Sequence, residues 1–99
     1  MKFWDWFDSR QAKAFAQDLA AFIVAELRGQ MEARDAKFAA KAQKTLVKAA
    51  RKLQAFKAGH RLNVYTKSRL ANGFLWALKD GGCPPAYADE LTEWLTMRL

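Results

Sequence analysis

The 99-residue sequence contains one cysteine, Cys83, and one histidine, His60. A single cysteine excludes a disulfide within the chain. One cysteine and one histidine cannot supply the four ligands of a structural zinc site without carboxylates or a second chain. We therefore expect no disulfide and no metal. This cysteine usage is typical of a reducing compartment, and we expect the protein to be cytoplasmic.

Long apolar runs are also missing. In the apolar first half, the longest uncharged stretch runs from Leu19 to Ala25. A helix needs ~20 apolar residues to cross a bilayer, so we predict no transmembrane segment. Asp5 and Asp8 interrupt the aromatic residues near the start, and no apolar segment of signal-peptide type follows Lys2. We therefore expect no secretory signal.

Motifs that carry catalysis are absent as well. The sequence has no glycine-rich phosphate loop, no His-x-x-x-His pair and no Ser/His/Asp constellation. Cys83 lies between a Gly-Gly and a Pro-Pro pair, which predicts a partly exposed turn residue with no neighbouring base to activate it. His60 follows Gly59 at the expected end of a helix, where a cation caps the negative end of the helix dipole. We expect no catalytic residue, no cofactor and no enzymatic activity.

The sequence has only two prolines, at positions 84 and 85, and its apolar residues recur at helical spacing without sustained alternation. This pattern predicts an all-α fold. The length suits a single domain over residues 1–99. We predict a small bundle of about four helices. They cover approximately residues 9–28, 32–58, 67–80 and 85–98.

Capping residues predict where these helices begin and end. Asp8 is the expected N-cap of the first helix. Gly29 is its expected end, although one glycine costs only ~1 kcal/mol inside a helix, so the first two helices could be continuous. Thr66 or Ser68 can cap the third helix. Pro85 suits the first position of the fourth helix, whose N-terminal half carries acidic residues.

Large side chains at both ends of the chain are expected to complete a thin core. Residues 1–8 are rich in Phe and Trp, and we expect this segment to pack over the open end of the bundle. The alternative is docking to a partner or to a membrane interface. On the same argument we place Trp76, Trp94 and Met97 among the buried residues.

The helix expected at 32–58 has two distinct faces. An apolar stripe follows a 3-4-3-4-3 spacing and comprises Ala39, Ala42, Leu46, Ala49, Leu53 and Phe56. The opposite face collects only cations: Arg34, Lys37, Lys41, Lys44, Lys48, Arg51 and Lys52. At 100° per residue, these cations fall within an arc of about 100°.

Acidic residues are almost missing from the middle of the chain. Residues 34–79 contain twelve basic side chains against one acid, Asp35, a net charge of +11. Residues 1–33 have a net charge of −1 and residues 80–99 of −3, so the three segments add to the total of +7. Nearly all of the positive charge therefore lies in the middle of the chain, and this asymmetry is the main functional signal of the sequence.

The cationic face predicts a polyanionic ligand. Like charges four residues apart on a helix repel by a few tenths of a kcal/mol, and no acid on this face compensates them. Ammonium groups on a rigid helix can follow the phosphates of DNA or RNA. Lysine is a point charge, so we expect weak sequence specificity. The candidate binding residues are Lys37, Lys41, Lys44, Lys48, Arg51 and Lys52, with Lys67 and Arg69 as secondary contacts near the start of the third helix.

Other interpretations stay open. The cations can form a solvated helix face, or the acidic fourth helix can neutralise them. The face can bind an acidic protein, in which case the domain is a protein-interaction module that also uses its N-terminal aromatics. It can also attach to anionic lipid, which requires Phe38, Leu46, Leu53 and Phe56 to be free instead of buried. The oligomeric state is left open.

Overall fold

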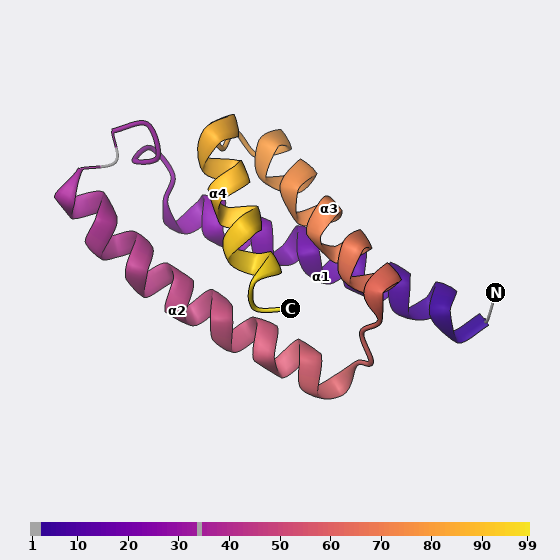
Figure 1. The fold of residues 1–99 in the computed structure, drawn as a ribbon. Coiled ribbons are helices and arrows are strands. Elements are labelled where there is room, and N and C mark those ends of the chain that lie inside the picture. The colour runs from indigo at the N-terminus through magenta and orange to yellow at the C-terminus, as the bar shows by residue number, and fades with distance from the viewer. Residues whose placement is uncertain (1–2, 34) are drawn as a thin grey trace.

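A computed structural model describes residues 3–33 and 35–99, with side chains from Arg10 onward. The described residues form four α-helices and no strand, which confirms the predicted all-α bundle (Figure 1). The helices are α1 (Phe3–Glu26), α2 (Ala36–Gly59), α3 (Val64–Asp80) and α4 (Pro85–Thr96). In Figure 1, α3 lies along α1, α4 is next to α3, and α2 runs along one side of the bundle.

The first helix is longer than predicted at its N-terminal end. It begins at Phe3, so Asp8 lies inside the helix and the expected N-cap there is wrong. The aromatic residues before Asp8 already recur at helical spacing, and this periodicity continues the helix through the capping signal. The predicted packing of the side chains of residues 1–8 lies outside the described part of the molecule.

The break between the first two helices is confirmed. α1 ends at Glu26, and Gly29 adopts a left-handed backbone with φ of 79°. Glycine reaches this region without steric cost because it lacks a Cβ. Asp35 then caps α2, and its side chain accepts a hydrogen bond of 2.9 Å from the backbone N–H of Phe38. α2 therefore begins four residues later than predicted.

Small residues bring α1 and α3 close together. Ala12 and Ala16 on α1 are fully buried, and α3 contributes Gly73 opposite them. A Cβ built on Gly73 would lie 3.6 Å from the Cβ of Ala16, an ordinary van der Waals distance. The interface also contains larger side chains that are fully or almost fully buried, namely Leu19, Ile23, Leu70, Phe74 and Leu78. This pair of helices forms the centre of the core.

The start of α3 differs from the prediction. Asn63, and neither Thr66 nor Ser68, is the N-cap. Asn63 and Thr66 form a capping box, in which each side chain accepts a 2.8 Å hydrogen bond from the backbone N–H of the other. Such a box satisfies two N–H groups that the first helical turn leaves free. α3 therefore starts at Val64, three residues earlier than predicted.

The end of α3 buries Cys83, which the sequence places in an exposed turn. Gly82 is left-handed, with φ of 93°. The N–H of Gly82 donates to the carbonyl of Lys79 at 3.1 Å, and that of Cys83 to the carbonyl of Leu78 at 3.0 Å. These two bonds define a Schellman motif, which commonly brings the residue after the glycine onto the last turn of the helix. Cys83 is therefore buried within the same core as Leu78.

The buried stripe of α2 is rotated from the predicted one. The buried residues are Phe38, Ala42, Thr45, Ala49 and Leu53. Ala39 is exposed, while Leu46 and Phe56 are half-buried. The large ring of Phe38 gains more from burial than the methyl group of Ala39, and this turns the helix toward Phe38. Thr45 is carried inward by the same rotation, and its hydroxyl has no hydrogen-bond partner.

Two of the expected core residues are exposed. Trp76 is 55% exposed and Met97 is 79% exposed, so both predictions are wrong. Trp76 follows the fully buried Phe74 by two residues, which rotates it about 200° around the helix axis. Phe74 occupies the core-facing position, and Trp76 is left on the outer side. Trp94 is half-buried and packs against the core as predicted.

Candidate functional site

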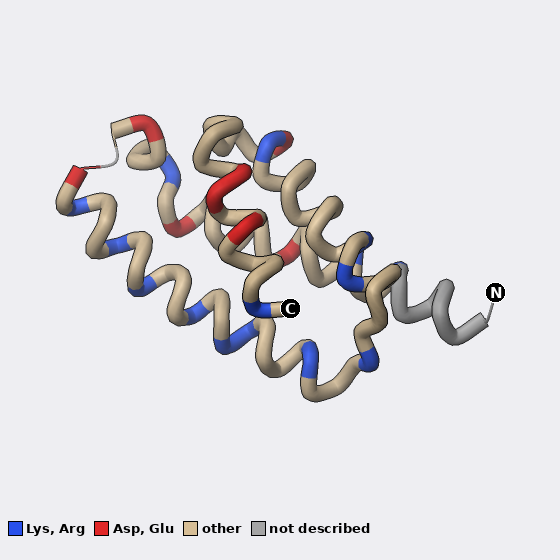
Figure 2. Tube along the Cα trace, viewed as in Figure 1, with Lys and Arg blue, Asp and Glu red and all other residues tan. Residues whose placement is uncertain are grey.

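Six side chains on α2 form an exposed cationic surface, which we call the basic face. It consists of Lys37, Lys41, Lys44, Lys48, Arg51 and Lys52, all exposed. Arg34, which the sequence adds to this group, lies outside the described residues. Figure 2 shows the cations of α2 spaced along the helix, with the acidic residues concentrated on other elements. At 1.5 Å per residue, the basic face extends for about 22 Å.

The interior side of α2 explains why the basic face points outward. Ala49 and Leu53 are fully inaccessible to solvent, and Phe38 packs edge-on against Tyr87 of α4 with ring centroids 5.4 Å apart. At the other end of α2, the rings of Phe15 and Phe56 stack with centroids 4.3 Å apart. With both ends of its apolar side held in this way, α2 turns its lysines to solvent.

Little inside the molecule neutralises the basic face. Within the described part of the chain it makes one ion pair, in which Lys48 Nζ lies 3.8 Å from Glu26 Oε1 on α1. The two side chains are 58% and 36% exposed, and pairs in such settings contribute only about 0–1 kcal/mol. The Lys52 ammonium lies 4.8 Å from the ring centroid of Phe22.

A cavity of about 430 Å³ separates the first half of α2 from the end of α1. Four members of the basic face line it, together with Ala40, Thr45 and Glu26. The ammonium groups can donate hydrogen bonds to anionic oxygens there. Besides these ammonium groups, the lining has one carboxylate and one hydroxyl, and so it offers charge and hydrogen bonds.

The two secondary residues lie away from the basic face, on α3. Lys67 is half-buried and Arg69 is exposed. The hydroxyl and N–H of Thr66 are already engaged by Asn63, so they are not open to a phosphate. Lys67 and Arg69 therefore remain candidates through their own side chains.

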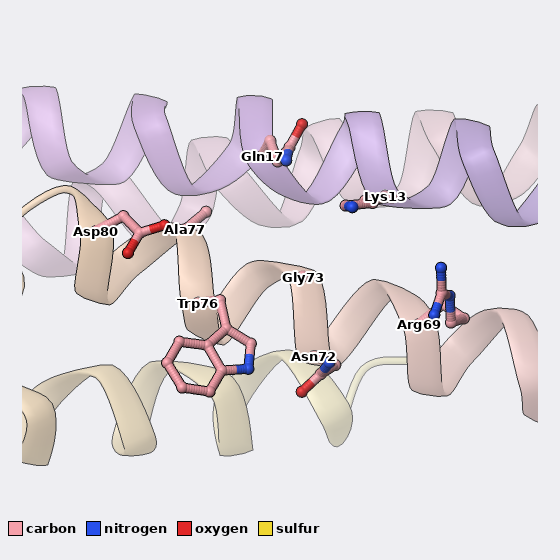
Figure 3. A pocket seen from close by; sticks show the side chains of 8 residues that line it. All are labelled: Lys13, Gln17, Arg69, Asn72, Gly73, Trp76, Ala77 and Asp80. Carbon is pink, nitrogen blue, oxygen red and sulfur yellow. The ribbon is translucent and has the colours of Figure 1, made fainter.

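Arg69 belongs to a second site that the sequence analysis missed. A groove of about 470 Å³ lies between α1 and α3 (Figure 3). We call it the α1–α3 groove, and its lining residues are Lys13, Gln17, Arg69, Asn72, Gly73, Trp76, Ala77 and Asp80. The spacing of Tyr65, Arg69, Asn72 and Trp76, which is 4-3-4, places them on one face of α3 and is the signal that could have revealed it.

His60 has the capping role that its position predicts. Its Nδ1 lies 2.9 Å from the carbonyl oxygen of Phe56, which can only accept, so Nδ1 donates. The imidazole also stacks on the ring of Phe56 with centroids 4.0 Å apart. Nearby, Lys57 Nζ donates a 2.7 Å hydrogen bond to the carbonyl of Arg98. The Lys57 hydrogen bond joins the end of α2 to the C-terminal residues of the chain.

Comparison with protein-family models, with curated proteins and with solved structures finds no match to this chain. Among the described helices, none combines the length and the apolar character that a membrane span requires. The described residues contain no cluster of three or more His, Cys, Asp or Glu side chains suited to a metal. Function is therefore inferred from the chemistry of the residues alone.

Proposed function

We propose that this domain binds nucleic acid through its phosphate backbone, using the basic face, with weak sequence specificity and without catalysis. The observation that supports it is a row of six exposed cations on one helix, for which the described residues provide a single weak ion pair, from Glu26 to Lys48. A surface of this kind gains affinity by releasing the counterions condensed on DNA or RNA. We place this activity in the cytoplasm.

The apolar side of α2 argues against attachment to anionic lipid. That mode needs the apolar face of the helix to enter the membrane. Phe38 and Leu53 are buried in the bundle, and Leu46 and Phe56 are half-buried. The face that would enter lipid already packs against α1 and α4.

The proposal is tested by removing charge from the basic face. We expect Lys41→Gln with Lys44→Gln to keep the fold, because both side chains are exposed and Gln is a comparable helix former. Affinity for duplex and single strands should fall to a similar extent, measured by fluorescence anisotropy over a salt series. The slope of log affinity against log salt should flatten by up to ~0.9 for each lost phosphate contact.

A matched control separates the basic face from net charge. Arg28→Gln with Arg61→Gln removes the same charge from exposed positions outside the basic face. We expect this pair to change the salt slope less than the lysine pair does. Equal effects of the two pairs, or no affinity of the parent for either nucleic acid at low salt, would refute the proposal.

A second candidate is a module that binds an acidic protein. Val47 is 48% exposed beside the basic face, and it lines a hollow of about 510 Å³ with Lys44, Lys48 and Arg51. An apolar side chain among cations suits a protein surface better than a phosphate chain. Binding to one acidic protein with no affinity for nucleic acid would favour this function. Val47→Ala would then weaken that binding.

A further inference from the structure

The outer face of α3 carries two exposed aromatic residues, each next to a cation. Trp76 is 55% exposed, and the Lys79 ammonium lies 5.1 Å from the centroid of its ring. Tyr65 is 57% exposed, and the guanidinium carbon of Arg69 lies 6.0 Å from its ring centroid. Each ring therefore offers a flat apolar surface beside a positive charge.

The two rings share one side of the helix. Tyr65 and Trp76 are eleven residues apart, which rotates one by only about 20° from the other and separates them by about 16 Å along the axis. Arg69 and Asn72 lie between them on the same side. A stacked strand advances about 3.4 Å per nucleotide, so the separation of Tyr65 and Trp76 along the helix matches roughly five stacked nucleotides. An extended strand would span the same separation with fewer nucleotides.

The α1–α3 groove adds charge and hydrogen-bonding groups to this row. Figure 3 shows Lys13 and Gln17 on α1 and, on α3, Arg69 directed toward α1 at the end where Lys13 lies, while Asn72 and Trp76 point away from α1. Asp80 occupies the opposite end of the groove. Gly73 and Ala77 also line the groove, and their small side chains fill little of it.

The chemistry of this surface matches an unpaired strand. Lys13 and Arg69 can bind phosphate, while the amide groups of Gln17 and Asn72 can donate and accept hydrogen bonds at base edges. Exposed aromatic rings stack on bases of any sequence. A duplex cannot use such rings, because its bases are already stacked and paired.

We propose that the outer face of α3, with the α1–α3 groove, binds single-stranded nucleic acid by stacking one base on Trp76 and another on Tyr65, with intervening phosphates held by Arg69 and Lys13. This inference rests on the proposed function for the class of ligand. It adds a preference for single strands, because the basic face contacts phosphates of either form. The base on Trp76 stacks on the ring face opposite Lys79.

The test compares two ligands with one set of variants. The probe is a fluorescent strand of about twenty nucleotides of mixed sequence, used alone or paired with its complement. We expect Trp76→Ala to weaken single-strand binding by about 5- to 160-fold, the range that loss of one stacked base gives. Duplex binding should change by less than about twofold. Trp76→Phe should keep most of the affinity, and Tyr65→Ala should reproduce the selective loss.

Controls distinguish the loss of base stacking from the loss of the fold and from a failure of the proposed function. Val64→Ala removes an apolar side chain that is 82% exposed on the same helix, away from the row, and should leave both affinities unchanged. Circular dichroism checks that each variant is folded. If the parent binds both ligands and Trp76→Ala changes neither affinity, or both equally, the stacking site is wrong while the proposed function stands. If the parent binds neither ligand, the proposed function fails, and this inference with it.

Discussion

The α1–α3 pair and the helix α2 are packed in different ways. Between α1 and α3, alanines meet a glycine, and the two backbones run close together. α2 instead contacts its neighbours through large rings, as in the Phe15–Phe56 stack and the Phe38–Tyr87 pair. The distance between two packed helices follows the size of the side chains at their contact. α2 is therefore held further from the core than α3.

This difference in packing explains how the molecule combines a closely packed core with a highly charged helix. Close backbone packing gives α1 and α3 many dispersion contacts, each weak and together large. α2 has fewer such contacts, carries like charges four residues apart, and buries the unpaired hydroxyl of Thr45. We infer that α2 opens locally more readily than α1 and α3. Two outward surfaces result, one on α2 and one on α3, supported by interfaces of different strength.

The largest effect is expected in the close-packed region. Phe74 is fully buried on α3, and Phe74→Ala should lower the free energy of unfolding by about 3–5 kcal/mol through lost burial and a cavity. Chemical denaturation followed by circular dichroism measures this change. Because the centre of the core is affected, α1, α3 and α4 should lose structure together. A loss below about 1 kcal/mol would mean that this interface is not the centre of stability.

A smaller effect is expected on α2. Leu53 is fully buried, and Leu53→Ala should cost about 2–3 kcal/mol, the lower part of the usual range, because a helix held by side chains alone can relax into the space. Native-state hydrogen exchange should show faster exchange of α2 amides and little change in α1 and α3. Uniform acceleration in all helices would show that α2 is as tightly coupled as the rest.

The smallest effect tests the close approach itself. Gly73→Ala should raise stability by about 0.5–1 kcal/mol, because alanine favours the helix and the new Cβ would meet Ala16 at 3.6 Å without a clash. Gly82→Ala is the matched control, since its φ of 93° strains any other residue and should lower stability. Thermal unfolding of the two variants measures whether each substitution raises or lowers the stability. A destabilised Gly73→Ala variant would mean that α1 and α3 approach more closely still.

Much of the fold follows from local signals. Helical spacing predicts four helices, and the structure confirms them. Gly29 marks the break after α1, because glycine adopts the left-handed conformation without steric cost. Pro85 marks the start of α4, because its fixed φ suits the first helical position. The exposure of the six cations on α2 is also predictable. The free-energy cost of burying an unpaired charge is larger than the free energy that packing its side chain would gain.

The candidate sites are predictable only in part. The basic face lies on one helix, so periodicity assembles it completely. The α1–α3 groove needs residues from two helices that are far apart in the sequence, such as Lys13 and Arg69. Their meeting depends on how α3 is rotated against α1, which local spacing does not specify.

The sequence alone determined which residues share a helix and which faces carry charge, because these properties depend on neighbours within one or two turns. The tertiary structure decided which of several apolar side chains became core. Phe74 and Trp76 are both large enough, and contact of α3 with α1 buried the first and exposed the second. Cys83 was buried by the turn that ends α3, and Thr45 by the rotation of α2 onto Phe38. For Phe74, Trp76 and Thr45, close packing between distant segments selected one arrangement from several that local propensity allows.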